Sequence, residues 1–251
     1  MPRLAARPYG FAIILTLLAL WCLPAGPATA DDLMAQAAAA YAQRADMKQA
    51  RLAADLYAKA LAADPKSDTA AWRLSQAWFW IGINTPEGQD VEPFEKSVNA
   101  AKQAVAINPN SLPGHYWLGV AYGVYGKAKG IMKSLSLVDP IKEEMNWVIS
   151  KDPKYENGGP YRVLGRLYFK LPGLFGGDTD KAIANLKQAV QTGPSRWINH
   201  LYLAEVYLKE DQVPEAKALI KQIIAGPAET GFEPEYKIWK AEAEQLLKKA
   251  N

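Results

Sequence analysis

The sequence predicts an all-α fold in which one helical hairpin is repeated along the chain. One observation is a short signature, a Leu followed by a small residue and then by an aromatic residue four positions after the Leu. The signature begins at Leu74, Leu118, Leu164 and Leu203. The other observation is a Pro after stretches whose apolar residues recur three and four positions apart, at Pro65, Pro109, Pro153 and Pro194. Because Pro cannot continue a helix, each copy is predicted to be two amphipathic helices followed by a stop.

Taken in order, the predicted hairpins span residues 32–65, 65–109, 109–153, 153–194 and 194–228. The first opens on an Ala-rich helix that we expect to act as a terminal cap. The next three are 44, 44 and 41 residues long, with their extra residues mostly between the two helices of a hairpin. A longer surface turn costs only about 0.6 kcal/mol per doubling of its length. Residues 233–249 then form a single amphipathic closing helix, with Tyr236, Trp239, Ala243 and Leu246 on one face.

The signature and its spacing resemble the tetratricopeptide repeat (TPR), whose standard hairpin has 34 residues. The resemblance covers residues 32–227, and the last hairpin keeps the standard length. It implies a TPR-like α-solenoid of about five helical hairpins plus a C-terminal capping helix, over residues 31–251. The lengthened hairpins and the run GGPYRVLGRLYFKLPGLFGGDTDKAI are similar to the helical-repeat segment of the regulator-of-microtubule-dynamics proteins and to the periplasmic TPR subunit of TRAP transporters.

Residues 1–30 are predicted to be a cleaved secretory signal peptide. Arg3 and Arg7 precede the apolar run 11–23, and an Ala-x-Ala site ends at Ala30. This predicts cleavage after Ala30, a periplasmic or secreted protein, and no transmembrane span in the mature chain. An uncleaved anchor is the alternative, but 13 apolar residues are fewer than the roughly 20 that a span needs. A lipoprotein at Cys22 is disfavoured because a Trp precedes it.

Composition argues against catalysis and against nucleic-acid binding. Without residues 1–30 the chain has 27 basic and 26 acidic residues and no Cys, so no excess of positive charge remains. The two histidines, His115 and His200, each lie three residues before a signature Leu, where we expect packing roles. No nucleophile–base or phosphate-loop motif is present, and Asp178 is predicted to cap a helix. We therefore expect no enzyme activity, no cofactor and no metal.

Binding is the predicted function. The TPR resemblance implies that the first helices of successive hairpins line a concave groove. Positions two before, two after and five after each signature Leu give the expected lining: Trp72, Gln76, Phe79, Tyr116, Val120, Gly123, Arg162, Arg166, Phe169, Leu201, Glu205 and Leu208. Exposed aromatic and Arg side chains often carry interface energy. An alternative for about half of the aromatic rings is that they only fill space between helices.

These observations predict an exported, non-catalytic TPR adaptor that binds a protein or peptide partner through its groove. The alternative, suggested by the transporter resemblance, is a periplasmic carrier of a small hydrophobic ligand associated with a transport system. Because the chain carries an export signal, microtubule association is not expected.

Two stretches leave their roles open. Arg162, Arg166 and Lys170 share one helix face, and either Glu205 or an acidic partner could compensate their repulsion. Four glycines from 119 to 130 form a stripe that requires the close approach of a helix, a ligand or a partner, since Gly weakens a helix by about 1 kcal/mol. Lysines flank this stripe and apolar residues follow it, so a membrane-surface helix is a further alternative, which the glycines disfavour.

Overall fold

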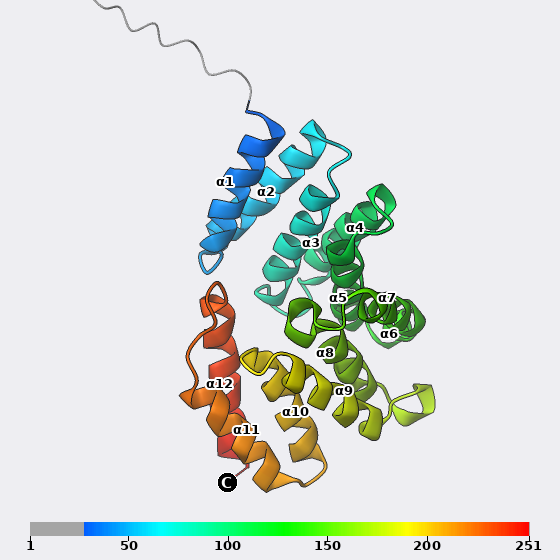
Figure 1. Ribbon diagram of the computed structural model, residues 1–251, viewed down its shortest axis with the longest axis vertical. Helices are drawn as coiled ribbons and strands as arrows, with labels where there is room; N and C mark the ends of the chain where they lie inside the picture. Colours follow the sequence, from blue (N-terminus) through cyan, green and yellow to red (C-terminus); the bar gives the residue numbers. More distant parts are fainter. Residues whose placement is uncertain (1–27, 251) are drawn as a thin grey trace, which may run out of the picture.

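In the computed structural model, the described residues are 28–250, so the predicted signal segment lies almost wholly outside them, Cys22 included. The described residues form α-helices and one short 3-10 helix, η1, and none of them is in a strand (Figure 1). The elements are α1 (Ala30–Ala42), α2 (Met47–Ala63), α3 (Asp68–Ile83), α4 (Val91–Ile107), α5 (Leu112–Lys129), α6 (Ile131–Ser136), α7 (Val138–Lys151), α8 (Tyr155–Lys170), η1 (Gly173–Phe175), α9 (Thr179–Thr192), α10 (Trp197–Lys209), α11 (Val213–Ala225) and α12 (Glu233–Lys249).

The prediction of five hairpins and a closing helix is confirmed. The first helices of the hairpins are α1, α3, α5, α8 and α10, and the second helices are α2, α4, α7, α9 and α11. The extra residues of the third and fourth hairpins form α6 and η1, between the first and second helix. Asp178 caps α9 as predicted, because its side chain accepts a hydrogen bond from the backbone N–H of Lys181 at 2.9 Å.

The signature exists because its small residue lies where the second helix of the hairpin crosses the first. A Cβ atom added at Gly165 would lie 2.6 Å from Cγ of Leu186 on α9, and one at Gly119 would lie 2.4 Å from Cε of Met145 on α7. Both facing side chains are fully buried. The helices of a hairpin can therefore pack closely only if this position stays small.

The glycine stripe of α5 does not form one surface. Gly119 contacts α7 as described, whereas a Cβ at Gly126 would lie 3.0 Å from the backbone of Ser134 on α6. Gly130 ends α5 with a φ of 98°, a left-handed value that Gly adopts without strain. Gly123 lies inside the helix and has no atom within 4 Å of its added Cβ. Three of the four glycines thus serve packing or helix termination, and Gly123 faces open space.

The two ends of the solenoid meet, which the sequence did not predict. Helix α12 packs on α10 and α11 and buries Ala243, as expected of a closing helix. It also reaches the turn between α1 and α2, where the Arg44 guanidinium pairs with Glu235 at the start of α12 (Figure 1). Ile238 of α12 packs against the core of the first two hairpins. The described part of the chain therefore curls into a closed arrangement rather than an open spiral.

Within residues 28–250, no helix combines the length and apolar character that crossing a bilayer would need.

A pair of Gly→Ala variants tests the close approach of the hairpin helices. Gly165→Ala should lower the free energy of unfolding, because overpacking against Leu186 costs about 1–3 kcal/mol and outweighs the gain of about 1 kcal/mol in helix propensity. Gly123→Ala should raise it by about 1 kcal/mol, since nothing lies near its Cβ. Urea denaturation of both variants measures the difference, and equal effects would contradict the packing argument.

Candidate binding cavity

The first helices of all five hairpins and the closing helix line a cavity of about 820 Å³. Most of its wall is apolar or aromatic. Helices α3, α5, α8, α10 and α12 contribute, among others, Phe79, Trp80, Trp117, Val120, Val163, Leu167, Ile198, Tyr202, Ile238 and Trp239. Clefts of this size and apolar character are typical binding sites.

The structure brings some of the predicted lining residues together at this cavity. Those that line it are Gln76, Phe79, Tyr116, Val120, Gly123, Arg162 and Arg166. The other five, Trp72, Phe169, Leu201, Glu205 and Leu208, are not among its lining residues.

Four of the five residues that do not line the cavity pack against other side chains, and the fifth, Glu205, pairs with Arg166. Leu201 is fully buried in the core of the last two hairpins, because α10 turns Ile198 and Tyr202 toward the cavity instead. Trp72 packs between two core clusters and lies 4.1 Å beneath the Arg73 guanidinium. Phe169 and Leu208 pack on the core of the last two hairpins. For the aromatic rings of Trp72 and Phe169, the space-filling alternative describes the observed packing.

The closing helix and the segment before it supply cavity residues that sequence reasoning missed. These are Phe232, Glu235, Ile238, Trp239 and Glu242. The amphipathic pattern of 233–249 predicted a helix with one apolar face, but not which neighbours that face would meet. Only the curvature of the whole solenoid brings α12 opposite α3 and α5 (Figure 1).

Arg166 and Arg162 already have partners within the chain. Arg166 donates a hydrogen bond to Glu205, and its Cζ lies 4.1 Å from the Tyr202 ring centroid. Arg162 is buried and donates to Asn199 Oδ1 at 2.8 Å and to Tyr116 Oη at 2.7 Å. The intramolecular alternative for the basic helix face is therefore the one that the structure shows.

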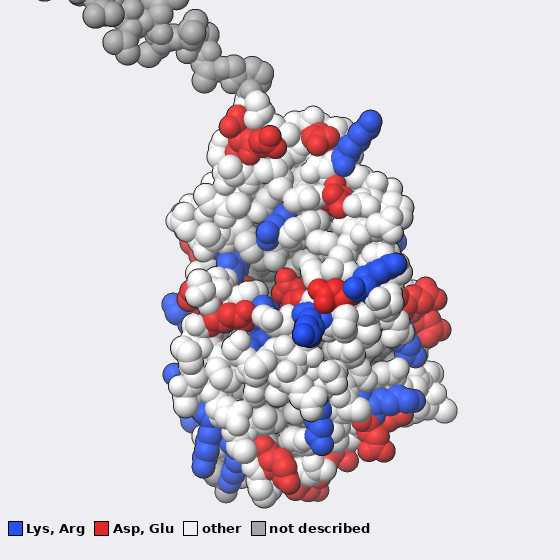
Figure 2. Space-filling model, in the orientation of Figure 1, with Lys and Arg blue, Asp and Glu red and all other residues white. Residues whose placement is uncertain are grey.

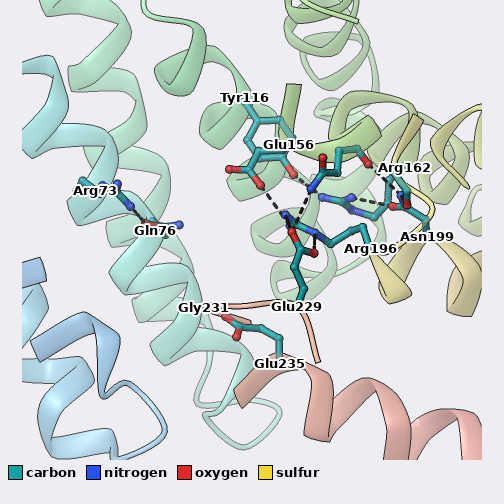
Figure 3. A network of polar contacts seen from close by, with 12 residues as sticks. Arg73, Gln76, Tyr116, Glu156, Arg162, Arg196, Asn199, Glu229, Gly231 and Glu235 are labelled. Carbon is teal, nitrogen blue, oxygen red and sulfur yellow. Dashed lines mark hydrogen bonds and ion pairs between the residues drawn. The ribbon is translucent and has the colours of Figure 1, made fainter. Parts of the chain in front are cut away.

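Arg196 lies at the centre of a polar network beside the cavity (Figure 3). Its Nε donates to Glu229 at 2.8 Å, its Nη1 donates to Glu156 at 3.2 Å, and its Cζ lies 3.8 Å from the Phe232 ring centroid. Asn157 donates to the same Glu229 at 3.1 Å. The network joins the start of α8, the start of α10 and the segment that leads into α12.

The start of α8 is strained where it joins this network. Glu156 and Asn157 have φ values of 49° and 53°, in the left-handed region that costs a non-Gly residue roughly 1–3 kcal/mol. Asn199 Nδ2 holds this turn by donating to the Asn157 carbonyl at 2.9 Å. The strained turn brings the Glu156 carboxylate to the cavity wall and to Arg196.

Like Arg196, Arg44 binds the segment that leads into α12, at the side of the cavity. Its Nε donates to Glu235 Oε1 at 2.8 Å, and its Nη2 donates to the Gly231 carbonyl at 2.5 Å. The Trp80 indole N–H donates to the Arg44 carbonyl at 2.7 Å, which fixes the turn that carries the guanidinium. Arg44 and Arg196 together hold residues 229–235 across one side of the cavity.

The two histidines lie in packed surroundings. His115 stacks on Trp147 with ring centroids 3.8 Å apart, and its nitrogens face Glu144 and the Pro109 carbonyl. His200 is 3% exposed, and burial lowers its pKa below the ordinary 6.5.

Over residues 28–250, no three His, Cys, Asp or Glu side chains are grouped as a metal site would require. Figure 2 shows acidic and basic side chains mixed over one face of the molecule.

The buried His200 predicts a pH dependence of stability. The unfolded chain binds a proton at His200 below pH 6.5, whereas the folded chain does so only at lower pH, so stability should fall as the pH drops through this interval. Above pH 6.5 the residue is neutral in both states and contributes no slope. His200→Phe should remove this part of the acid loss. Urea titrations on both sides of pH 6.5 measure it, and an unchanged slope would contradict the assignment.

The ion pair between Arg44 and Glu235 is predicted to contribute to the free energy that opening of α12 requires. Glu235→Ala leaves a guanidinium that is 5% exposed without its carboxylate, so the opening free energy of α12 should fall by roughly 1.5–3 kcal/mol. Hydrogen exchange of the α12 amides measures this change. Glu244→Ala, an exposed position on the same helix, is the control and should leave exchange unchanged. Equal exchange in both variants would show that the ion pair does not hold the helix.

Comparison with known proteins gives the family. The sequence profile of the regulator of microtubule dynamics protein 1-3 family matches residues 33–174, more than half of the chain. A tetratricopeptide repeat profile matches residues 176–236. No curated protein matches the chain.

Solved structures share the fold. A thermophilic TPR protein of Thermus thermophilus is 22% identical, with a TM-score of 0.64 over 86% of this chain and 100% of that one. PilW, a widely conserved type IV pilus biogenesis factor, is 17% identical, with a TM-score of 0.58 over 88% and 92%. PilF of Pseudomonas aeruginosa is 16% identical, with a TM-score of 0.52 over 86% and 92%. These likenesses show a TPR solenoid, and with the profile match over 33–174 the chain belongs to the regulator of microtubule dynamics protein 1-3 family.

Proposed function

We propose that the protein is an exported, non-catalytic TPR scaffold that binds an apolar segment of a protein partner in its central cavity. The TPR fold is that of a protein–protein interaction scaffold. The observation that carries the proposal is the cavity of about 820 Å³, whose wall is mostly apolar and aromatic. Export rests on the signal features of residues 1–30.

The charges beside the cavity favour an apolar segment over an acidic one. Arg162, Arg166 and Arg196 each have hydrogen-bond partners within the chain. At Arg166 or Arg196, a partner carboxylate would have to displace Glu205 or Glu229 and leave that side chain without its cation. Arg162 is buried and already donates to Asn199 and Tyr116. Such an exchange gains little free energy, because one charge pair replaces another. Apolar side chains that enter beside Phe79 and Trp239 lose contact with water without breaking an existing pair.

A small hydrophobic ligand is the second candidate occupant. The observation that favours it is that α12 closes one side of the cavity, which makes the cavity deeper than an open groove (Figure 1). Its volume lies within the range of about 300–1,000 Å³ that small-molecule sites occupy. The two candidates share the site and differ in what co-purifies with the protein.

A cavity-filling variant tests both occupants. Val120→Trp fills space at the wall, so capture of a partner from envelope extract should fall roughly tenfold or more. Leu52→Trp on α2, at an exposed position away from the cavity lining, is the control and should retain capture. Undiminished capture by Val120→Trp would overturn the cavity proposal. Native mass spectrometry that finds a small molecule on the wild-type chain and none on Val120→Trp would instead favour the second candidate.

A further inference from the structure

The two insertions of the solenoid carry the most exposed large apolar side chains of residues 28–250. Met132 is 78% and Leu174 is 90% exposed, and Ile131 and Phe175 are 57% and 47% exposed. Ile131 and Met132 open α6, and Leu174 and Phe175 belong to η1. Both elements consist of residues beyond the standard hairpin. Large exposed apolar groups on a soluble fold commonly mark a contact surface.

The two insertions lie at the same end of the solenoid. Helices α5 and α8 are the first helices of consecutive hairpins and contact each other, so the turns that follow them emerge on the same side. Lys127 and Ile131 from one turn and Leu171 and Pro172 from the other border the same cavity. Lys127 at the end of α5 and Lys170 at the end of α8 line this cavity as well. Burial and the charges of Arg166 and Lys127 lower the pKa of Lys170, whereas Glu205 raises it.

The turn that carries Ile131 and Met132 is basic, whereas Asp178 and Asp180 directly follow the turn that carries Leu174 and Phe175. The segment 123–138 contains Lys127, Lys129 and Lys133 and no Asp or Glu, and the segment 166–177 contains Arg166 and Lys170 and no Asp or Glu. Glu205 neutralises Arg166 and lies 3.6 Å from Lys170. Lys127 and Lys129 are exposed. The lysines that flank Ile131 and Met132 are complementary to negative charge, and the apolar tips of both turns are complementary to an apolar layer beneath it.

We propose that the two insertions form a basic–apolar lip, residues 127–133 and 170–175, that docks the protein on an anionic lipid surface. Side chains of the Met132 and Leu174 type enter the boundary between headgroups and acyl chains, while lysines meet the lipid phosphates. The apolar side chains lie on two separate turns. A fluid lipid surface can rearrange around both of them. This inference is independent of the occupant of the cavity and of export.

Vesicle flotation of residues 28–250 tests the lip. This chain contains every described helix and omits the apolar run 11–23, which would bind vesicles by itself. It should bind vesicles of phosphatidylglycerol and phosphatidylcholine and not pure phosphatidylcholine vesicles. Lys129→Gln should weaken binding about fivefold. The double variant Met132→Ser/Leu174→Ser should weaken it roughly tenfold or more.

Matched controls lie on α2, where Lys48→Gln and Leu52→Ser change an exposed lysine and an exposed apolar residue away from the lip. They should leave vesicle binding unchanged, and circular dichroism should show equal helicity in all variants. Absent binding to anionic vesicles, or equal losses in lip and control variants, would overturn the proposal. It would also be overturned if the lip variants lost only the capture of an envelope protein, because the lip would then be a protein-docking surface.

Discussion

Two buried arginines decide whether this solenoid is an open spiral or a closed cavity. Arg44 and Arg196 come from the turns before α2 and α10, and both bind the segment 229–235. Their side chains are 5% exposed, so each guanidinium requires a carboxylate to compensate its lost hydration. Arg44 and Glu235 are 191 residues apart in the chain, and their pair joins the first hairpin to the closing helix together with the packing of Ile238.

The proposed function rests on how the other charges at the cavity are paired. At the cavity, Arg166 and Arg196 are paired with carboxylates of the chain, Arg162 donates to neutral groups, and apolar and aromatic side chains form most of the remaining wall. The strained turn at Glu156 and Asn157 belongs to this arrangement, since it brings a carboxylate to Arg196. The cavity is therefore organised before any partner arrives, which lowers the entropy lost on binding. At the insertions, by contrast, lysines and apolar tips remain on the surface.

The insertions also show how this chain departs from the standard repeat without losing the fold. The hairpins depend on close contacts such as Gly165 against Leu186, and these contacts lie in the paired helices. Extra residues between the helices leave those contacts intact, so α6 and η1 can vary in length and in chemistry. The repeat supplies the framework and the inserted turns supply a surface of their own.

The sequence by itself determined the hairpins, their boundaries and the closing helix, because these depend on helical periodicity and on neighbouring repeats. It named Glu205 and an acidic partner as alternatives for Arg166, and the structure shows Glu205. Seven of the twelve expected lining positions also lie at the cavity. The sequence could not reveal the rotation of α10, which buries Leu201 and turns Tyr202 inward, or the return of α12 to Arg44. Those features depend on the summed curvature of five hairpins, and small rotations at each interface accumulate along a solenoid in a way that only the tertiary structure decides.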